Sequence, residues 1–154
     1  MEALKTERDH FQAAETKILH DLANGDTVQQ WVAKTSRASG IESLYTGMEN
    51  ALKLVLKALG ERIDADHDDL TRTGFHARLL ERAASTALDR PAVISAQLYQ
   101  DLDELRRFRH LQRNVYGSSL RNDRVNELMK LSIEAVDRFS KEIEVYKAAI
   151  ENKS

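Results

Sequence analysis

Four arginines and one histidine lie close together in the stretch RRFRHLQRNVYG, residues 106–117, which contains no acidic residue. An arginine side chain stays charged, and its planar fork of N–H donors suits carboxylate and phosphate groups. The whole chain has a formal net charge of -2, so any contact with nucleic acid should be confined to a local basic patch. This stretch is therefore the first candidate for a phosphate-binding site.

Arg109 falls on the apolar side of the helix expected here. At about 100° per residue, four residues lie within roughly 40° of it: Leu98, Leu102, Leu105 and Tyr116. Arg113 lies on the same side. Burying a guanidinium without a partner destabilises the fold by several kcal/mol, on the order of the cost of breaking a buried ion pair. We therefore expect Arg109 to have a carboxylate, phosphate or carbonyl partner.

A second apolar strip on the same helix faces another direction and consists of Phe108, Leu111 and Val115. A helix with two apolar strips is contacted from two sides. We expect one contact with its own bundle and the other with a partner subunit.

A carboxylate also lies on an apolar face, because Glu49 falls between Tyr45, Leu52 and Leu56. Glu49 and either Arg109 or His110 could satisfy each other. Two interpretations stay open. The polar residues could fix helix register with no chemistry, or an arginine-rich groove beside a tyrosine could hold a phosphate.

The composition and periodicity favour an all-α protein. Hydrophobic residues make up 42% and charged residues 31% of the 154 residues, with six glycines and one proline, as is typical of helical proteins. Helical spacing predicts five segments: residues 2–24, residues 26–59 with an interruption near Gly40, the short FHARLLERAAS (75–85), residues 96–116 and residues 122–150. Asp26 and Ser95 are the expected N-caps. Short connections predict an antiparallel four-helix bundle with one additional short helix, forming a single domain over residues 1–154.

Other features favour simpler interpretations. Trp31 and the stripe from Met48 to Leu59 are expected in the core, and His76 is expected to pack or cap a helix. The acidic segment 61–74 lacks the glycine and closing glutamate of a calcium loop. No cysteine and no long apolar run are present, so we expect a cytoplasmic protein with no membrane segment, no metal site and no cofactor.

The stretch FRHLQRNVYG, preceded by RPAVIS and LYQDLDEL, resembles the HEPN superfamily of helical ribonucleases, and in particular its HepT-like toxin branch. YTGMENALKLVLK and GFHARLLE add to the resemblance, which covers most of residues 26–146. In that family a motif R-x4-H-x-Y closes a helix, and two copies meet across a homodimer to form a metal-independent RNA-cleaving site. Arg109 and Tyr116 match the motif, and Asn114 occupies the histidine position.

The asparagine matters because an amide cannot take up a proton near neutral pH, whereas imidazole can. The resemblance implies catalytic roles for Arg109 and the residue at position 114, with His110 as a possible substitute base. Arg106 and Arg113 would bind RNA phosphate. Tyr45 and Glu49 would support this site.

The resemblance implies the toxin component of a toxin-antitoxin or phage-defence system, a metal-independent endoribonuclease acting on RNA. Its partner would be a minimal nucleotidyltransferase (MntA-like) antitoxin, which in some systems adds AMP to the motif tyrosine, here Tyr116. Asn114 favours an alternative, a catalytically degenerate HEPN module that binds this partner or RNA without cleaving. A helical dimer with a purely structural role would be favoured if the basic stretch were internally paired.

Overall fold

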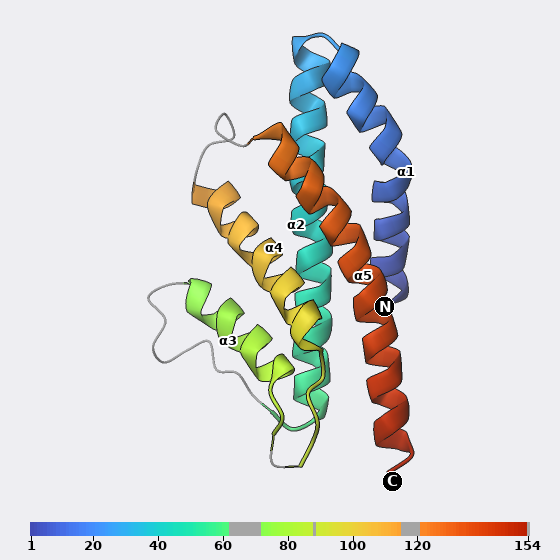
Figure 1. The fold of residues 1–154 in the computed structure, drawn as a ribbon, viewed down its shortest axis with the longest axis vertical. Helices are drawn as coiled ribbons and strands as arrows, with labels where there is room; N and C mark the ends of the chain where they lie inside the picture. Colours follow the sequence, from blue (N-terminus) through green and yellow to red (C-terminus); the bar gives the residue numbers. More distant parts are fainter. Residues whose placement is uncertain (62–71, 88, 115–120, 154) are drawn as a thin grey trace.

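The computed structural model describes residues 1–61, 72–87, 89–114 and 121–153. These residues form five helices, which Figure 1 shows along the chain: α1 (Glu2–Asn24), α2 (Thr27–Ala58), α3 (Arg72–Ala84), α4 (Ala96–Asn114) and α5 (Asn122–Glu151). The part of the chain described contains one isolated bridge between Ala87 and Arg90 and no strand. The prediction of an all-α fold is confirmed.

The helices pack as the bundle that the short connections predicted. α1 and α2 run antiparallel as a long hairpin, and α5 packs against both. α4 packs against α2 and α5, and the 13-residue α3 covers the side where α2 and α4 meet (Figure 1). The elements that carry Glu49, His76 and Arg109 therefore adjoin one another.

The helix boundaries follow from local capping. The Asp26 side chain accepts a hydrogen bond from the backbone N–H of Gln29 at 2.8 Å, and the Gln29 side chain accepts one from the backbone of Asp26 at 2.8 Å. Such a capping box satisfies two N–H groups that a helix start leaves unpaired. The Ser95 hydroxyl accepts from the backbone of Leu98 at 3.1 Å, so both expected N-caps are confirmed. α3 begins at Arg72 rather than at the expected Phe75.

Gly40 does not interrupt α2, which continues through it. A Cβ atom at Gly40 would lie 2.3 Å from Cε2 of Phe11 in α1. The glycine therefore marks a close approach of two helices, where any side chain would collide with the ring. The expected interruption was wrong, because a glycine inside a helical pattern can allow two helices to pack closely instead of ending its own helix.

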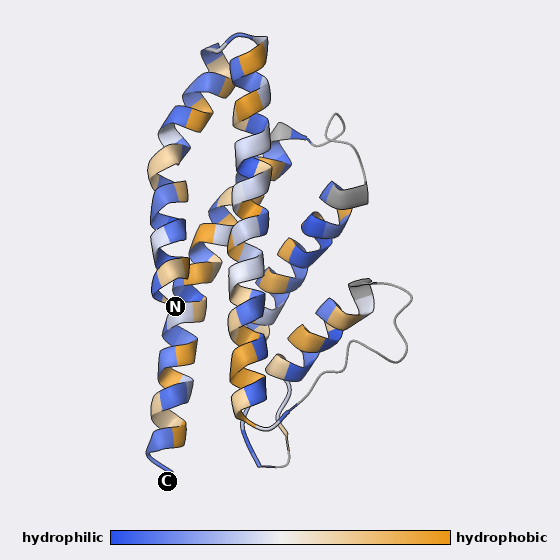
Figure 2. Ribbon diagram, turned by 180° about the vertical axis from the view of Figure 1, so that it is seen from behind, coloured by the Kyte–Doolittle hydropathy of each residue, from blue (hydrophilic) through white to orange (hydrophobic). Residues whose placement is uncertain are grey.

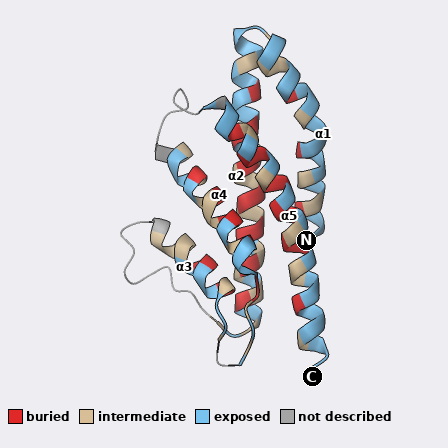
Figure 3. Cartoon of the chain, viewed as in Figure 1, coloured by how far each residue is buried: buried red, intermediate tan, exposed pale blue. Residues whose placement is uncertain are grey.

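The core runs along the middle of α2 and the facing sides of α4 and α5, as Figure 3 shows in red. The expected burial of the stripe is confirmed for Met48 and Leu52, which have no exposed surface, and for Leu56, which is 1% exposed. Val55 and Leu59 are partly buried against the core. Trp31 is 66% exposed, so its expected place in the core was wrong. It lies in the second turn of α2, and this end of the α1–α2 hairpin extends beyond the drawn helices α4 and α5 in Figures 1 and 2.

None of the helices in the described ranges is both long enough and apolar enough to cross a membrane.

Candidate functional site

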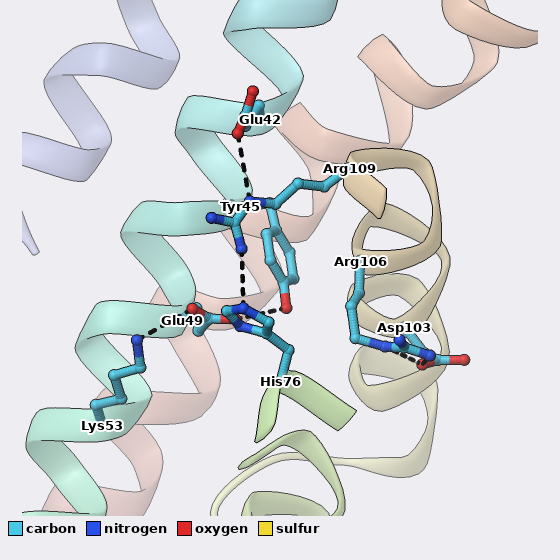
Figure 4. Close-up of polar contacts among 8 residues, drawn as sticks. All are labelled: Glu42, Tyr45, Glu49, Lys53, His76, Asp103, Arg106 and Arg109. Carbon is cyan, nitrogen blue, oxygen red and sulfur yellow. Dashed lines mark hydrogen bonds and ion pairs between the residues drawn. The ribbon is translucent and has the colours of Figure 1, made fainter. Parts of the chain in front are cut away.

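The carboxylate of Glu49 is buried at the junction of α2, α3 and α4 and accepts hydrogen bonds from three side chains (Figure 4). Its side chain is 2% exposed. The Tyr45 hydroxyl donates to it at 2.8 Å, the Lys53 ammonium at 3.2 Å and the His76 Nδ1 at 2.5 Å. Tyr45 and Lys53 lie four residues before and after Glu49, so helical spacing brings them to the same face of α2.

These contacts keep the Glu49 carboxyl ionised despite its burial. Burial raises the pKa of Glu49, but the Tyr45 hydrogen bond and the contacts with His76 and Lys53 lower it by more, so the pKa lies below its ordinary value of 4.5. Burial and the neighbouring Glu49 charge raise the pKa of Tyr45 well above its ordinary range. Tyr45 is therefore a hydrogen-bond donor here and cannot act as a base at neutral pH.

Arg109 extends from α4 toward α2 and lies over the Tyr45 ring (Figure 4). Its guanidinium carbon is 5.9 Å from the ring centroid, within the range of a cation–π contact. Its Nε donates to Glu42 at 3.3 Å, and its Nη1 lies 3.4 Å from Nε2 of His76. The side chain is 14% exposed. The prediction that Arg109 lies on the buried side of its helix, with a carboxylate partner, is confirmed.

The expected pairing of Glu49 with Arg109 or His110 was wrong. Glu42, about two turns before Glu49 on α2, receives the arginine instead. His76 lies between Glu49 and Arg109 and contacts both. Periodicity alone could not reveal this, because it gives each helix a buried face but not the position of α3 against α2 and α4.

The partners of His76 assign its tautomer. A carboxylate only accepts hydrogen bonds, so Nδ1 carries the proton that is donated to Glu49. A guanidinium only donates, so Nε2 is the acceptor toward Arg109. The expectation that His76 merely packs or caps a helix is replaced by a bridging role. The buried position of Glu49 could have indicated this role of His76. A buried carboxylate needs hydrogen-bond donors around it, and α2 supplies only part of them.

The other described cations of the basic stretch have a partner within α4. Asp103 binds Arg106 at 2.8 Å and Arg107 at 2.7 Å. Arg106, which we expected to bind RNA phosphate, is 16% exposed, whereas Arg107 is 74% exposed. His110 is exposed. Internal pairing of the basic stretch is what a purely structural role requires, and Asp103 provides such pairing for Arg106 and Arg107.

Several predicted site residues lie outside the described part of the chain. α4 ends at Asn114, but the side chains of Arg113 and Asn114 and the whole of Val115 and Tyr116 are not described. Their roles therefore stay predictions.

A groove of about 550 Å³ runs between α4 and the beginning of α5. Its apolar lining includes Phe108, Leu111, Val125 and Leu128, and its charged lining includes Glu104, Arg107, Arg121 and Arg124. The second apolar strip of α4 divides here, because Phe108 is 5% exposed and packs into the core, whereas Leu111 is 47% exposed. In the ranges described, no group of three acidic, histidine or cysteine side chains could hold a metal ion.

The fold and the site together define an all-α bundle in which a buried glutamate, a histidine and an arginine connect three helices. A family model described as HepT-like protein matches residues 36–150, more than half of the chain. The chain therefore belongs to the HepT-like family of the HEPN superfamily. The match begins within α2, so α1 lies outside it. No curated protein and no solved structure matches the chain.

Tyr45→Phe tests the charged state of the buried network. Because Glu49 has a lowered pKa, its carboxylate stabilises the fold above pH 4.5, and this stabilisation is lost as the pH falls through the lower folded-state pKa. Loss of the Tyr45 donor should reduce the free energy of unfolding at neutral pH by about 1.5–3 kcal/mol, the range for hydrogen bonds to charged groups. The difference from the parent should shrink below pH 4.5. Urea unfolding at several pH values measures both effects.

Tyr146→Phe is the matched control, because the Tyr146 hydroxyl is buried and has no hydrogen-bond partner among the residues that the structure describes. This change removes no hydrogen bond seen there and should not lower stability at either pH. An equal loss for Tyr45→Phe at neutral and acidic pH would show that the hydroxyl does not act through an ionised Glu49.

Proposed function

We propose that this chain is the toxin component of a toxin-antitoxin or phage-defence pair and that it cleaves RNA without a metal ion. One observation carries the proposal. Arg109, the first residue of the family motif, lies at a partly exposed junction with its guanidinium beside the Nε2 atom of His76. A cation next to a proton acceptor is what phosphodiester cleavage without a metal requires.

The contacts of Arg109 suit exchange for a phosphate. Its distances of 3.3 Å to Glu42 and 3.4 Å to His76 are long for hydrogen bonds that involve a charged group. A phosphate offers several charged oxygens to the planar guanidinium and can replace these weak contacts. Tyr45 below the guanidinium would keep Arg109 at the junction during this exchange.

A second candidate is a degenerate HEPN module that binds RNA or a nucleotidyltransferase partner without cleaving. Asn114 in the histidine position favours it. The ion pairs of Arg106 with Asp103 and of Arg109 with Glu42 favour the form of this module that binds a protein partner over the form that binds RNA, since they neutralise cations that an RNA-binding site would use.

We propose that the active form is a homodimer in which the groove between α4 and α5 faces a second copy. Leu111 offers exposed apolar surface in this groove. The lining of the groove carries charges of both signs, with Arg124 in an ion pair with Glu104 and Arg121 in one with Asp123. In a two-fold interface the same patch meets itself, so a patch with both signs can pair with its copy.

The proposed partner in the cell is a minimal nucleotidyltransferase that attaches AMP to Tyr116. This residue stands two positions after Asn114, where α4 ends. A bulky, negatively charged group so close in sequence to Arg109 and Arg113 would compete with RNA phosphate for these cations.

The cleavage prediction uses purified protein, RNA and EDTA. The parent should cleave RNA, and Arg109→Ala should lower kcat by about 100-fold or more, the typical cost of removing a group that stabilises transition-state charge. Lys141→Ala removes an exposed cation of α5 and should leave the rate unchanged. Gel analysis of a labelled RNA gives the rates, and circular dichroism verifies that each variant is folded.

Asn114→His separates the two candidates. If the parent is inactive and this variant cleaves, the chain is a degenerate module that the asparagine has silenced. If neither protein cleaves any RNA, the nuclease proposal fails. Cleavage by the parent contradicts the degenerate module.

Self-association is tested by Leu111→Asp, which places a charge in the groove between α4 and α5. We expect the dimer dissociation constant to rise about tenfold or more, equivalent to about 1.4 kcal/mol, in sedimentation equilibrium. Leu54→Asp is the matched control, because Leu54 is 68% exposed on another helix. A parent that is monomeric at micromolar concentration, or equal effects of both variants, would contradict the proposed interface.

Modification of Tyr116 is tested by co-expression with a minimal nucleotidyltransferase encoded beside the gene. Mass spectrometry should find one AMP moiety on a peptide that contains Tyr116, and none in Tyr116→Phe. An unmodified peptide from the parent would rule out this mode of neutralisation.

A further inference from the structure

We propose that His76, oriented by Glu49, is the general base of the RNA-cleaving site and does the work of the imidazole that position 114 lacks. This inference rests on the proposed nuclease function and names the residue that accepts the proton. It is carried by the positions of three side chains from three helices, Glu49 of α2, His76 of α3 and Arg109 of α4.

The geometry has the parts of a carboxylate–histidine pair that prepares a base. The 2.5 Å contact with Glu49 fixes the proton on Nδ1 and directs the lone pair of Nε2 to the other side of the ring. An adjacent carboxylate also stabilises the imidazolium that forms when Nε2 takes a proton. Glu49 in turn is held by Tyr45 and Lys53, so the orientation of the ring does not depend on one contact.

Nε2 faces the cation that the family motif provides. It lies 3.4 Å from Nη1 of Arg109, so a phosphate bound by this guanidinium would sit within a few ångströms of the imidazole. The His76 side chain is 18% exposed and that of Glu49 is 2% exposed. A ligand can therefore reach the histidine while the carboxylate behind it stays out of water. Figure 4 shows this order, with His76 between Glu49 and Arg109.

The site works only if Arg109 leaves His76 when RNA binds. A guanidinium that donates to Nε2 occupies the lone pair that a base needs. Movement of Arg109 onto a phosphate would free this lone pair and bring in the substrate in the same step. The long contacts of Arg109 with Glu42 and His76 make such an exchange possible without loss of strong bonds.

The reaction can then be written with its atoms balanced. The ribose 2′-hydroxyl gives its proton to Nε2 of His76, and the 2′-oxygen forms a bond to the adjacent phosphorus. The bond from this phosphorus to the 5′-oxygen of the next nucleotide breaks, and the 5′-oxygen takes a proton from water. Arg109 stabilises the negative charge on the phosphorane. The products are a 2′,3′-cyclic phosphate and a 5′-hydroxyl end, and the proton on His76 returns to solvent.

The test compares histidine variants of the full-length protein on one RNA substrate in EDTA. His76→Gln keeps polar atoms at the site but cannot accept a proton, so kcat should fall by about 100-fold to 10,000-fold, the range for a general base, with KM little changed. His20→Gln is the matched control, because His20 also lies beside a carboxylate, Asp21 at 3.5 Å, but is 70% exposed on α1. It should cleave as fast as the parent.

Chemical rescue distinguishes catalysis from support of the fold. His76→Ala should be inactive, and added imidazole should restore at least about a tenth of the rate, because the free base can enter the space that the side chain left. Failure of imidazole to restore activity in a folded His76→Ala protein would assign His76 a structural role and overturn the inference.

The remaining outcomes separate this inference from the nuclease function. If Arg109→Ala abolishes cleavage while His76→Gln cleaves like the parent, the nuclease proposal stands and the assignment of His76 is wrong. If His110→Gln alone removes activity, His110 is the base. If the parent cleaves no RNA under any condition, the nuclease function fails, and the assignment of the base fails with it.

Discussion

The buried carboxylate of Glu49 is the constraint on which the polar centre of this protein depends. An ionised group that is 2% exposed requires donors around it, and Tyr45, Lys53 and His76 supply them. One of these donors comes from α3, so the requirement ties this short helix to α2. Because the same histidine contacts Arg109, the requirement extends to α4. The contacts that satisfy one charge thus link three helices.

This arrangement gives the arginine-rich stretch two different parts. Arg106 and Arg107 share the single carboxylate of Asp103, and Arg107 is exposed on the surface of α4 whereas Arg106 is largely covered. Arg109 lies inward, over an aromatic ring and between two helices. Arg109 also contacts the imidazole of His76. An arginine in this position suits capture of one phosphate better than broad attraction of nucleic acid.

The sequence predicts the fold better than the site, for a physical reason. Helical periodicity and caps such as Asp26 depend on neighbouring residues, so they are readable along the chain. The inward position of Arg109 is readable in the same way. The contact of His76 with Glu49 joins residues 27 positions apart, and no local pattern encodes it. The burial of Trp31 was predicted wrongly for a related reason, because burial of its helix face depends on how far the neighbouring helices extend.

The most direct test of the account is the protonation of the His76 ring, measured by nitrogen NMR of the histidine side chains at neutral pH. We predict that His76 carries its proton on Nδ1 and leaves Nε2 unprotonated, and that Glu49→Gln weakens this preference. A proton on Nε2 with a bare Nδ1 would contradict it, because the ring could then neither donate to Glu49 nor accept a proton at the atom that faces Arg109.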